Sequence, residues 1–482
     1  MNVVTSSLEK YKKLSSPIKA SLWYTFCNLL TNGISFLVIP IYTRILTREE
    51  YGMYTTFQSW LNILIILATL NLYCGVFTRG LVQYETKRDE YTSSVQMLST
   101  IITGFFAIIV LCSRDWFLDS LNISGFVAVN MILYFLFFPA FSFWTARQRV
   151  EYKYKEMVIV TLASVLLTPL LSLGLLMFTD LKADAVILGF LLSQNIIGAI
   201  FYILNFLRGK VFFSREYWLE AIKFNIPLIP HYLSLIVLGQ SDRIMISNIC
   251  GSGDAGLYSL AYQISMAMNI IISAINGSLI PWTYSMMKEK KYSEIRKIAD
   301  FLCLFMMAIS VVIMVVAPEV VFFMGGKNYH NVIWVMPPVI CSVFFTFCYG
   351  LFSNIEFYFG NTKYVMIASV IGSILNIILN AIFIPIFGFI AAAYTTLFCY
   401  FVFMIAHYLF MKRICIKMKC NDNIYSIKNI LLFSIVLCLI AFVMLLIYDF
   451  MIVRYIIFVC VFSVGIIKKD IIMEKVKKMK NT

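Results

Sequence analysis

Apolar runs long enough to cross a lipid bilayer follow one another along nearly the whole chain, and short segments between them carry most of the charge. Hydrophobic side chains make up 61% of the 482 residues and charged ones only 13%, whereas a soluble domain averages about 25% charged residues. This composition excludes a soluble enzyme, a disordered chain and a coiled-coil or collagen-like rod. The sequence therefore predicts an all-α polytopic membrane protein without a separate soluble domain.

The apolar runs predict about 14 transmembrane helices, since each crossing takes about 20 residues. Their predicted ranges are 20–42, 51–76, 94–113, 123–145, 157–179, 184–207, 218–246, 256–282, 298–317, 331–355, 363–385, 388–411, 427–448 and 451–467. With the amino terminus in the cytoplasm, the inside segments carry 32 of the 39 Lys and Arg residues and the outside segments carry 7. Cytoplasmic loops are enriched in these residues, so both termini are predicted to be cytoplasmic.

Several classes of site and partner are not expected. The net charge of +14 lies in short clusters between apolar runs, which is typical of topology signals and anionic headgroup contacts rather than of nucleic-acid binding. Twelve single cysteines without a C-x-x-C pattern predict neither a disulfide framework nor a metal site, and no cofactor is expected. The chain has no Walker loop, H-E-x-x-H or G-x-S-x-G motif, so neither an enzyme nor an ATP-driven pump is predicted. The basic, apolar beginning lacks a cleavage site and is not read as a signal peptide.

The sequence contains an internal repeat. Glu50-Tyr-Gly52-Met-Tyr54 reappears 204 residues later as Asp254-Ala-Gly256-Leu-Tyr258, and the polar positions of helices 2 and 5 recur in helices 8 and 11. Both copies start on the same side of the membrane, which predicts two six-helix lobes in a parallel repeat around a central cavity. The predicted parts are an N-lobe at 1–213, a C-lobe at 214–412, and helices 13 and 14 with a basic tail at 413–482.

Polar side chains form stripes along several predicted helices, because they recur at spacings of three and four residues. Such residues either tie neighbouring helices together or line a water-filled cavity between the two lobes. Matching stripes in both halves favour the cavity. The residues predicted to line it are Asn28, Asn32, Asn62, Tyr262, Asn269 and Asn376.

Ionisable residues within or at the ends of the predicted spans are costly in a membrane and are functional candidates. Arg44 lies late in helix 1, the adjacent Asp242 and Arg243 lie late in helix 7, and Glu356 ends helix 10. Snorkelling to the interface is the alternative role for the residues at helix ends. These include Arg79, Arg147 and Arg149. His231 lies on the stripe of Ser234 and Ser241 and titrates near neutral pH when unperturbed.

Two segments carry a resemblance to a known family. Phe36-Leu-Val-Ile-Pro40-Ile-Tyr-Thr43-Arg44-Ile-Leu46 followed by Gly52-Met-Tyr54 resembles the opening of bacterial O-antigen and capsule polysaccharide flippases, which belong to the multidrug/oligosaccharidyl-lipid/polysaccharide exporter superfamily. Ser241-Asp242-Arg243 followed by Gly256-Leu-Tyr258 is similar to the seventh helix of that family. The resemblance covers helices 1–12. The two additional helices are similar to those of lipid II flippases.

The resemblance implies two lobes arranged in a V and the export of undecaprenyl-diphosphate-linked sugar repeat units across the bacterial inner membrane. On this hypothesis Arg44, Arg243 and Arg79 bind the diphosphate, and Asp242, Glu356 or His231 couples transport to an ion. The implied partners are the lipid-linked glycan, membrane lipids, a polysaccharide polymerase and chain-length machinery. Two alternatives remain open: a cation-coupled multidrug exporter of the same fold, and a membrane polysaccharide polymerase, although every predicted outside loop is short.

Overall fold

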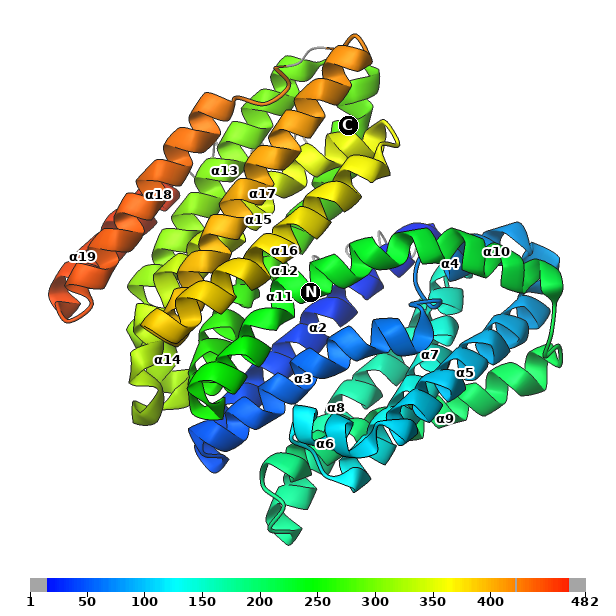
Figure 1. Ribbon diagram of the computed structural model, residues 1–482. Coiled ribbons are helices and arrows are strands. Elements are labelled where there is room, and N and C mark those ends of the chain that lie inside the picture. Colours follow the sequence, from blue (N-terminus) through cyan, green and yellow to red (C-terminus); the bar gives the residue numbers. More distant parts are fainter. Residues whose placement is uncertain (1–14, 421–422, 468–482) are drawn as a thin grey trace, which may run out of the picture. The chain divides into compact units, whose positions relative to one another are not determined.

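The computed structural model describes residues 15–420 and 423–467, which form helices and no β-strand (Figure 1). This confirms the all-α prediction. The α-helices are α2 (Ser16–Ile45), α3 (Arg48–Thr69), α4 (Val76–Gln83), α5 (Arg88–Cys112), α6 (Arg114–Leu121), α7 (Gly125–Val150), α8 (Tyr154–Phe178), α9 (Ala183–Gly209), α10 (Arg215–Asn225), α11 (Ile229–Cys250), α12 (Ser252–Lys288), α13 (Tyr292–Val315), α14 (Ala317–Gly325), α15 (Met336–Tyr358), α16 (Thr362–Phe387), α17 (Phe389–Lys417), α18 (Ile427–Ile447) and α19 (Met451–Ile467). Three 3-10 stretches are η1 (Glu85–Lys87), η2 (Ile226–Leu228) and η3 (Lys327–Trp334).

Within the described residues, 12 helical segments are long and apolar enough to cross a membrane. Two of the predicted spans are not among them. The second span corresponds to α3, whose first turn contains Arg48, Glu49 and Glu50, and the fourteenth corresponds to α19, whose apolar stretch is the short Met451–Cys460. The membrane-spanning architecture is therefore confirmed, and the number fourteen stays a prediction.

The predicted helix 51–76 is wrong at its end, because α3 stops at Thr69. Leu70 and Asn71 both have left-handed backbone conformations, with φ of 47° and 53°, which an α-helix of L-residues does not accommodate. The side chain of Asn225 donates a hydrogen bond to the Leu70 carbonyl. A contact from a distant part of the chain thus satisfies a carbonyl at this break.

The predicted helix 218–246 is likewise not continuous. It consists of α10, the 3-10 stretch η2 and α11; Pro227 lies in η2 and Pro230 lies in the first turn of α11. Proline lacks the N–H that an inner helical turn requires, so the chain changes helix type here.

Two short helices that the sequence analysis missed strengthen the internal repeat. α6 begins at Arg114, directly after α5, and α14 begins at Ala317, directly after α13, which is 203 residues later. Both were assigned to the connections after the predicted third and ninth helices. Their matching places indicate that the duplication includes these connections as well.

Packing divides the chain into two compact units. Of the described residues, unit 1 contains those up to Ile39 together with Phe57–Leu233, and unit 2 contains Pro40–Thr56 and those from Ser234 onward. The divisions fall inside α2, α3 and α11, so each of these helices contributes to both units. The lobe boundaries predicted from the repeat stay predictions.

In unit 1, α9 packs against α5, α7 and α8, while α10 packs against α4 and α5. A buried aromatic cluster joins the ends of these helices. Phe77 lies 4.3 Å from Phe143 and 5.6 Å from Tyr91 between ring centroids, and Tyr91 lies 5.3 Å from Tyr217 on α10. This cluster fixes α10 as part of unit 1.

In unit 2, α13, α15, α17 and α18 lie side by side, and α16 packs against α17 (Figure 1). The beginning of α3 also belongs to this unit, where Gly52 contacts the beginning of α12. A Cβ atom at Gly52 would lie 1.7 Å from the Ser252 carbonyl oxygen, and one at Gly256 would lie 2.5 Å from the Arg48 carbonyl oxygen. Positions 48 and 252 are related by the same 204-residue offset as positions 52 and 256. A reciprocal contact of this kind is what a local two-fold relation between the copies produces.

Arg454 attaches α19 to unit 2. Its guanidinium donates hydrogen bonds to both carboxylate oxygens of Glu319 at 2.9 Å and to the Val315 carbonyl at 2.8 Å. The arginine is almost fully buried, while the Glu319 side chain is 38% exposed.

Replacing Arg454 by methionine is expected to lower stability by about 1–3 kcal/mol, since hydrogen bonds between charged groups are lost but water reaches the remaining carboxylate. Thermal unfolding of the purified protein measures this effect. Arg114→Met, an exposed arginine in unit 1, is the matched control. An equal melting temperature for Arg454→Met and the control would contradict the structural role.

Candidate functional site

Asp242 lies on α11 and is almost completely buried, with 1% of its surface exposed. Its Oδ1 accepts a hydrogen bond from Asn380 Nδ2 at 2.6 Å, and its Oδ2 accepts from the hydroxyls of Tyr258 at 2.5 Å and Thr396 at 2.7 Å. These donors lie on α16, α12 and α17. Four helices of unit 2 therefore meet at one carboxylate.

Asn376 extends this arrangement by one turn along α16. Its Oδ1 accepts from Ser241 Oγ at 3.0 Å and from Asn380 Nδ2 at 3.2 Å, and its Nδ2 donates to Thr396 Oγ1 at 3.1 Å. A further bond runs from Thr395 to Asn380 Oδ1. All of these side chains are buried. The Asp242 network comprises Ser241, Asp242, Tyr258, Asn376, Asn380, Thr395 and Thr396.

The hydrogen bonds shown to the Asp242 carboxylate all come from neutral donors. A carboxylate buried at low dielectric costs several kcal/mol unless a counter-charge compensates it. Neutral hydrogen bonds offset part of that cost, and a proton or a bound cation would remove the charge. Among the described residues, no cluster of three or more His, Cys, Asp and Glu side chains is placed to hold a metal ion. The Asp242 network is not such a cluster, because it contains a single carboxylate and its other polar groups are amides and hydroxyls.

Arg243, the next residue, is also buried but uses different partners. Its Nη1 donates to the Gly239 carbonyl at 3.2 Å and to the side chain of Gln240. Its guanidinium carbon lies 4.4 Å from the centroid of the Tyr262 ring, within the range of a cation–π interaction. Tyr262 and Arg243, both singled out in the sequence, therefore contact each other in unit 2.

Arg44 lies in the last turn of α2 and is exposed. Its Nη2 donates to the Phe323 carbonyl at 3.2 Å, and its guanidinium lies 6.0 Å from the Phe323 ring. The neighbouring Thr43 bonds the Met324 carbonyl. These contacts hold the end of α2 against α14. The exposed guanidinium has further N–H groups beyond this one bond.

Arg79 lies on α4 in unit 1, with 57% of its side chain exposed. It lies 4.0 Å from Glu220 and 5.2 Å from the Phe224 ring, both on α10. Tyr84 donates to Glu220 at 2.7 Å and to Glu216 at 2.9 Å. The arginine therefore belongs to a charged cluster at the α4–α10 contact.

The six asparagine and tyrosine side chains predicted to line a cavity differ in exposure. Asn28, Asn32 and Asn62 are exposed on the parts of α2 and α3 that belong to unit 1. Asn269 on α12 is half-buried and donates to Met266 Sδ at 2.8 Å. Asn376 and Tyr262 are buried in the contacts described above.

Glu356 forms a contact that was not predicted. Its Oε1 lies 2.9 Å from His407 Nδ1 on α17, and both side chains are fully buried. Glu356 Oε2 and His407 Nε2 have no hydrogen-bond partner among the described residues. His231 lies on the part of α11 that belongs to unit 1, with its ring 5.8 Å from that of Tyr232.

Arg147, at the end of α7, forms ion pairs in unit 1. It bonds Asp89, and its Nε donates to Glu151 at 2.7 Å. Burial alone would raise the pKa of Glu151, but hydrogen bonds from Lys153 and Arg147 outweigh this effect and lower the pKa below its ordinary value. These pairs fix Arg147 within its own unit.

Comparisons with known proteins agree with this architecture. The family model described as polysaccharide biosynthesis protein matches residues 18–287. A protein of the Lsg locus of Haemophilus influenzae is 24% identical over 370 residues, which are 74% of this chain and 89% of that protein. The succinoglycan biosynthesis transport protein ExoT of Rhizobium meliloti is 21% identical, over 56% of this chain and 54% of its own length.

Two groups of solved structures share the fold. The lipid II flippase MurJ in an inward closed conformation superimposes with a TM-score of 0.69 at 15% identity, covering 94% of this chain and all of that one. An inward-facing multidrug resistance MATE transporter gives a TM-score of 0.62 at 15% identity, covering 80% and 95%. These likenesses establish the fold.

Proposed function

The chain belongs to the polysaccharide biosynthesis protein family, and from this membership we propose that it flips undecaprenyl-diphosphate-linked oligosaccharide repeat units to the outer leaflet of the bacterial inner membrane, for O-antigen or capsule synthesis. The family match over residues 18–287 is the observation that carries this proposal. The relative named as a succinoglycan transport protein supports it. Both termini would lie in the cytoplasm, and the polymerase and chain-length machinery would act on the flipped product.

The polar glycan must cross ~30 Å of hydrocarbon, where each unpaired hydroxyl costs several kcal/mol. We assign its transient hydrogen bonds to the exposed Asn28, Asn32 and Asn62 and to the half-buried Asn269. Tyr262 is assigned to packing against Arg243, because its ring is buried there. Asn376 is assigned to the Asp242 network instead, because its buried amide accepts two hydrogen bonds and donates one there. Alternating access of the two lobes would then present the glycan on the other side.

The diphosphate would be held by arginine, whose planar guanidinium suits bidentate phosphate binding. Arg44 and Arg79 are the main candidates, since both are exposed. Arg243 would contribute mainly through its charge, because its side chain is buried against Tyr262. Moving two negative charges outward against an interior-negative potential of about 100 mV is favourable by about 4.6 kcal/mol.

The Asp242 network would couple transport to an inward proton or sodium gradient. Its buried carboxylate accepts hydrogen bonds from neutral donors only, and protonation or sodium binding would remove its charge. Glu356 is a weaker candidate, because it is paired with His407 inside unit 2, and His231 on α11 is the third candidate.

Flipping is tested directly in vesicles that contain the purified protein and a lipid-linked oligosaccharide. The fraction of glycan that an external glycosidase cleaves should rise with time only when the protein is present. Deletion of the gene should also cause unflipped lipid-linked repeat units to accumulate. Resistance to organic cations without glycan flipping would favour a multidrug exporter, and accumulation of flipped but unpolymerised units would favour a polymerase.

Arg44→Ala is expected to reduce flipping about tenfold or more, since a hydrogen bond between charged groups contributes ~1.5–3 kcal/mol. The glycosidase-accessible fraction measures this rate at matched protein levels. Arg44→Lys keeps the charge without the bidentate geometry, so an intermediate rate is expected. Arg114→Ala is the matched control, and wild-type flipping by Arg44→Ala would exclude the diphosphate role.

A further inference from the structure

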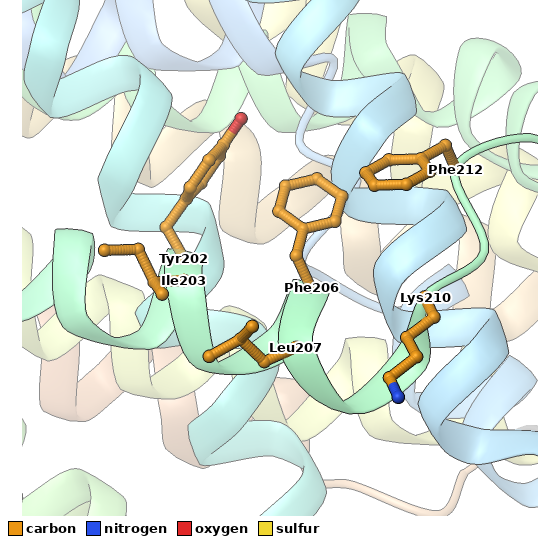
Figure 2. A pocket seen from close by; sticks show the side chains of 6 residues that line it. All are labelled: Tyr202, Ile203, Phe206, Leu207, Lys210 and Phe212. Carbon is orange, nitrogen blue, oxygen red and sulfur yellow. The ribbon is translucent and has the colours of Figure 1, made fainter.

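A groove in unit 1 lies where α9 ends and the chain turns toward α10 (Figure 2). It has a volume of about 390 Å³, within the usual range for ligand pockets. Five of the side chains that line it are apolar or aromatic, and the sixth is a lysine. They are Tyr202, Ile203, Phe206, Leu207, Lys210 and Phe212. We propose that this groove binds one anionic phospholipid of the cytoplasmic leaflet, with an acyl chain on the apolar wall and the headgroup phosphate at Lys210.

One wall of the groove is a row of aromatic rings. The ring centroids of Tyr202 and Phe206 lie 5.0 Å apart, and those of Phe206 and Phe212 lie 5.3 Å apart in a stacked arrangement. The Tyr202 hydroxyl is 2.9 Å from Thr100 Oγ1 on α5. Figure 2 shows Phe206 and Phe212 next to each other, with Lys210 on the turn between them. This wall therefore offers contact area to a hydrocarbon chain.

The turn that forms the groove is held in place by its neighbours. Lys210 has a left-handed backbone with φ of 57°, which ends α9. Ser93 Oγ then donates to the Val211 carbonyl at 2.8 Å and accepts from the Val211 N–H at 3.2 Å. The groove exists before a ligand arrives, so binding costs little ordering of the protein.

The position of the groove points to a lipid. Four exposed apolar residues lie along one face of α9 at spacings of four, three and four: Ile196, Ile200, Ile203 and Leu207. Such a stripe is typical of a helix face in contact with acyl chains. Ile203 and Leu207 at its end belong to the groove. The apolar wall thus continues an exposed apolar stripe of α9.

Charge at the same end favours an anionic headgroup. Arg208, Lys210 and Arg215 are all exposed there, and basic residues attract anionic lipids of the cytoplasmic leaflet. Two nearby carboxylates have other partners, since Asp89 pairs with Arg147 and Glu216 accepts from Tyr84. None of the ion pairs found among the described residues involves the Lys210 ammonium, so it remains available to a phosphate.

Native mass spectrometry of the delipidated, purified protein tests the proposal with dioleoyl phosphatidylglycerol and dioleoyl phosphatidylcholine. The wild type should retain one phosphatidylglycerol in preference to phosphatidylcholine. Lys210→Gln should lower the affinity for phosphatidylglycerol about fivefold, the effect of one basic residue near the membrane surface, and Lys210→Arg should restore it. Phe212→Ser, which removes part of the aromatic wall, should weaken the binding of both lipids.

Lys155→Gln is the matched control, because it makes the same charge change at an exposed site at the beginning of α8, outside the groove. An equal loss of affinity for phosphatidylglycerol in Lys155→Gln and Lys210→Gln would overturn the proposal. Equal retention of both lipids by the wild type would overturn it as well. Free inorganic phosphate should not displace the lipid, and displacement would point to a phosphate site instead. Phospholipid binding does not depend on the proposed transport function, so the two can fail separately.

Discussion

Gly52→Ala is expected to destabilise the protein by about 3 kcal/mol, since overpacking of a close contact costs this much. The added Cβ would lie 1.7 Å from the Ser252 carbonyl oxygen, which belongs to backbone and cannot rotate away. The beginnings of α3 and α12 would have to separate. Gly256→Ala should have the same effect in a milder form, because its Cβ would lie 2.5 Å from the Arg48 carbonyl oxygen.

Thermal unfolding and the yield of monodisperse protein measure this prediction. Gly277→Ala is the matched control, because Gly277 lies on the same helix α12 and a Cβ there would have nothing within 4 Å. It should be neutral or stabilising by about 0.4–1 kcal/mol, as alanine restricts the unfolded chain. Similar melting temperatures for Gly52→Ala and Gly277→Ala would refute the close contact between the repeats.

Hydrophobicity was sufficient to predict most of the long helices, because a membrane-spanning helix satisfies its backbone hydrogen bonds internally. The predicted helix boundaries are wrong where the backbone depends on contacts with distant parts of the chain. At the break, the Leu70 carbonyl accepts a hydrogen bond from the side chain of Asn225, 155 residues away. Neither Leu70 nor Asn225 is a glycine or a proline, the residues that would mark a turn in the sequence. The break before α11 contains Pro227, and Pro230 follows in the first turn of α11, so here the sequence did carry a signal.

Part of the candidate site, the residue Asp242, was predictable from the same apolar pattern. A carboxylate such as Asp242 inside an apolar run is conspicuous, since its burial is costly. The hydrogen-bond partners of Asp242 are less conspicuous in the sequence. Tyr258 stands out only as part of the repeat motif, and Thr396 is one of many hydroxyl residues in apolar helices. His407 was likewise missed as the partner of Glu356, because the pairing of helices α15 and α17 decides that contact.

Asp242→Asn is expected to abolish the response of glycan flipping to an imposed cation gradient. The asparagine has nearly the shape of aspartate, and its carbonyl oxygen still accepts from Tyr258 and Thr396. Its amide nitrogen replaces the oxygen that accepts from Asn380 Nδ2, so that one hydrogen bond is lost while the size of the side chain is kept. The negative charge is lost as well. At ~1.5–3 kcal/mol for an interaction with a charged group, sodium affinity should fall about 10- to 150-fold.

Vesicles with imposed sodium or proton gradients measure the response through the glycosidase-accessible glycan, and sodium binding is measured separately by calorimetry. Ser241→Ala is the control, since it removes one hydrogen bond at the edge of the Asp242 network without changing its charge. It should keep the gradient response. An unchanged response in Asp242→Asn would place the coupling site elsewhere, with Glu356 as the next candidate.

The same variant separates the two possible ions. A protonated carboxylic acid is neutral, as asparagine is, so for a proton-coupled protein Asp242→Asn imitates the proton-bound state and should behave at every pH as the wild type does at low pH. For a sodium-coupled protein the amide is a poor substitute for a carboxylate ligand, and the variant should behave like the wild type in sodium-free buffer. Because the size and shape of the side chain are nearly constant between the two residues, the direction of the change in behaviour reports the charge of Asp242 and the ion that neutralises it.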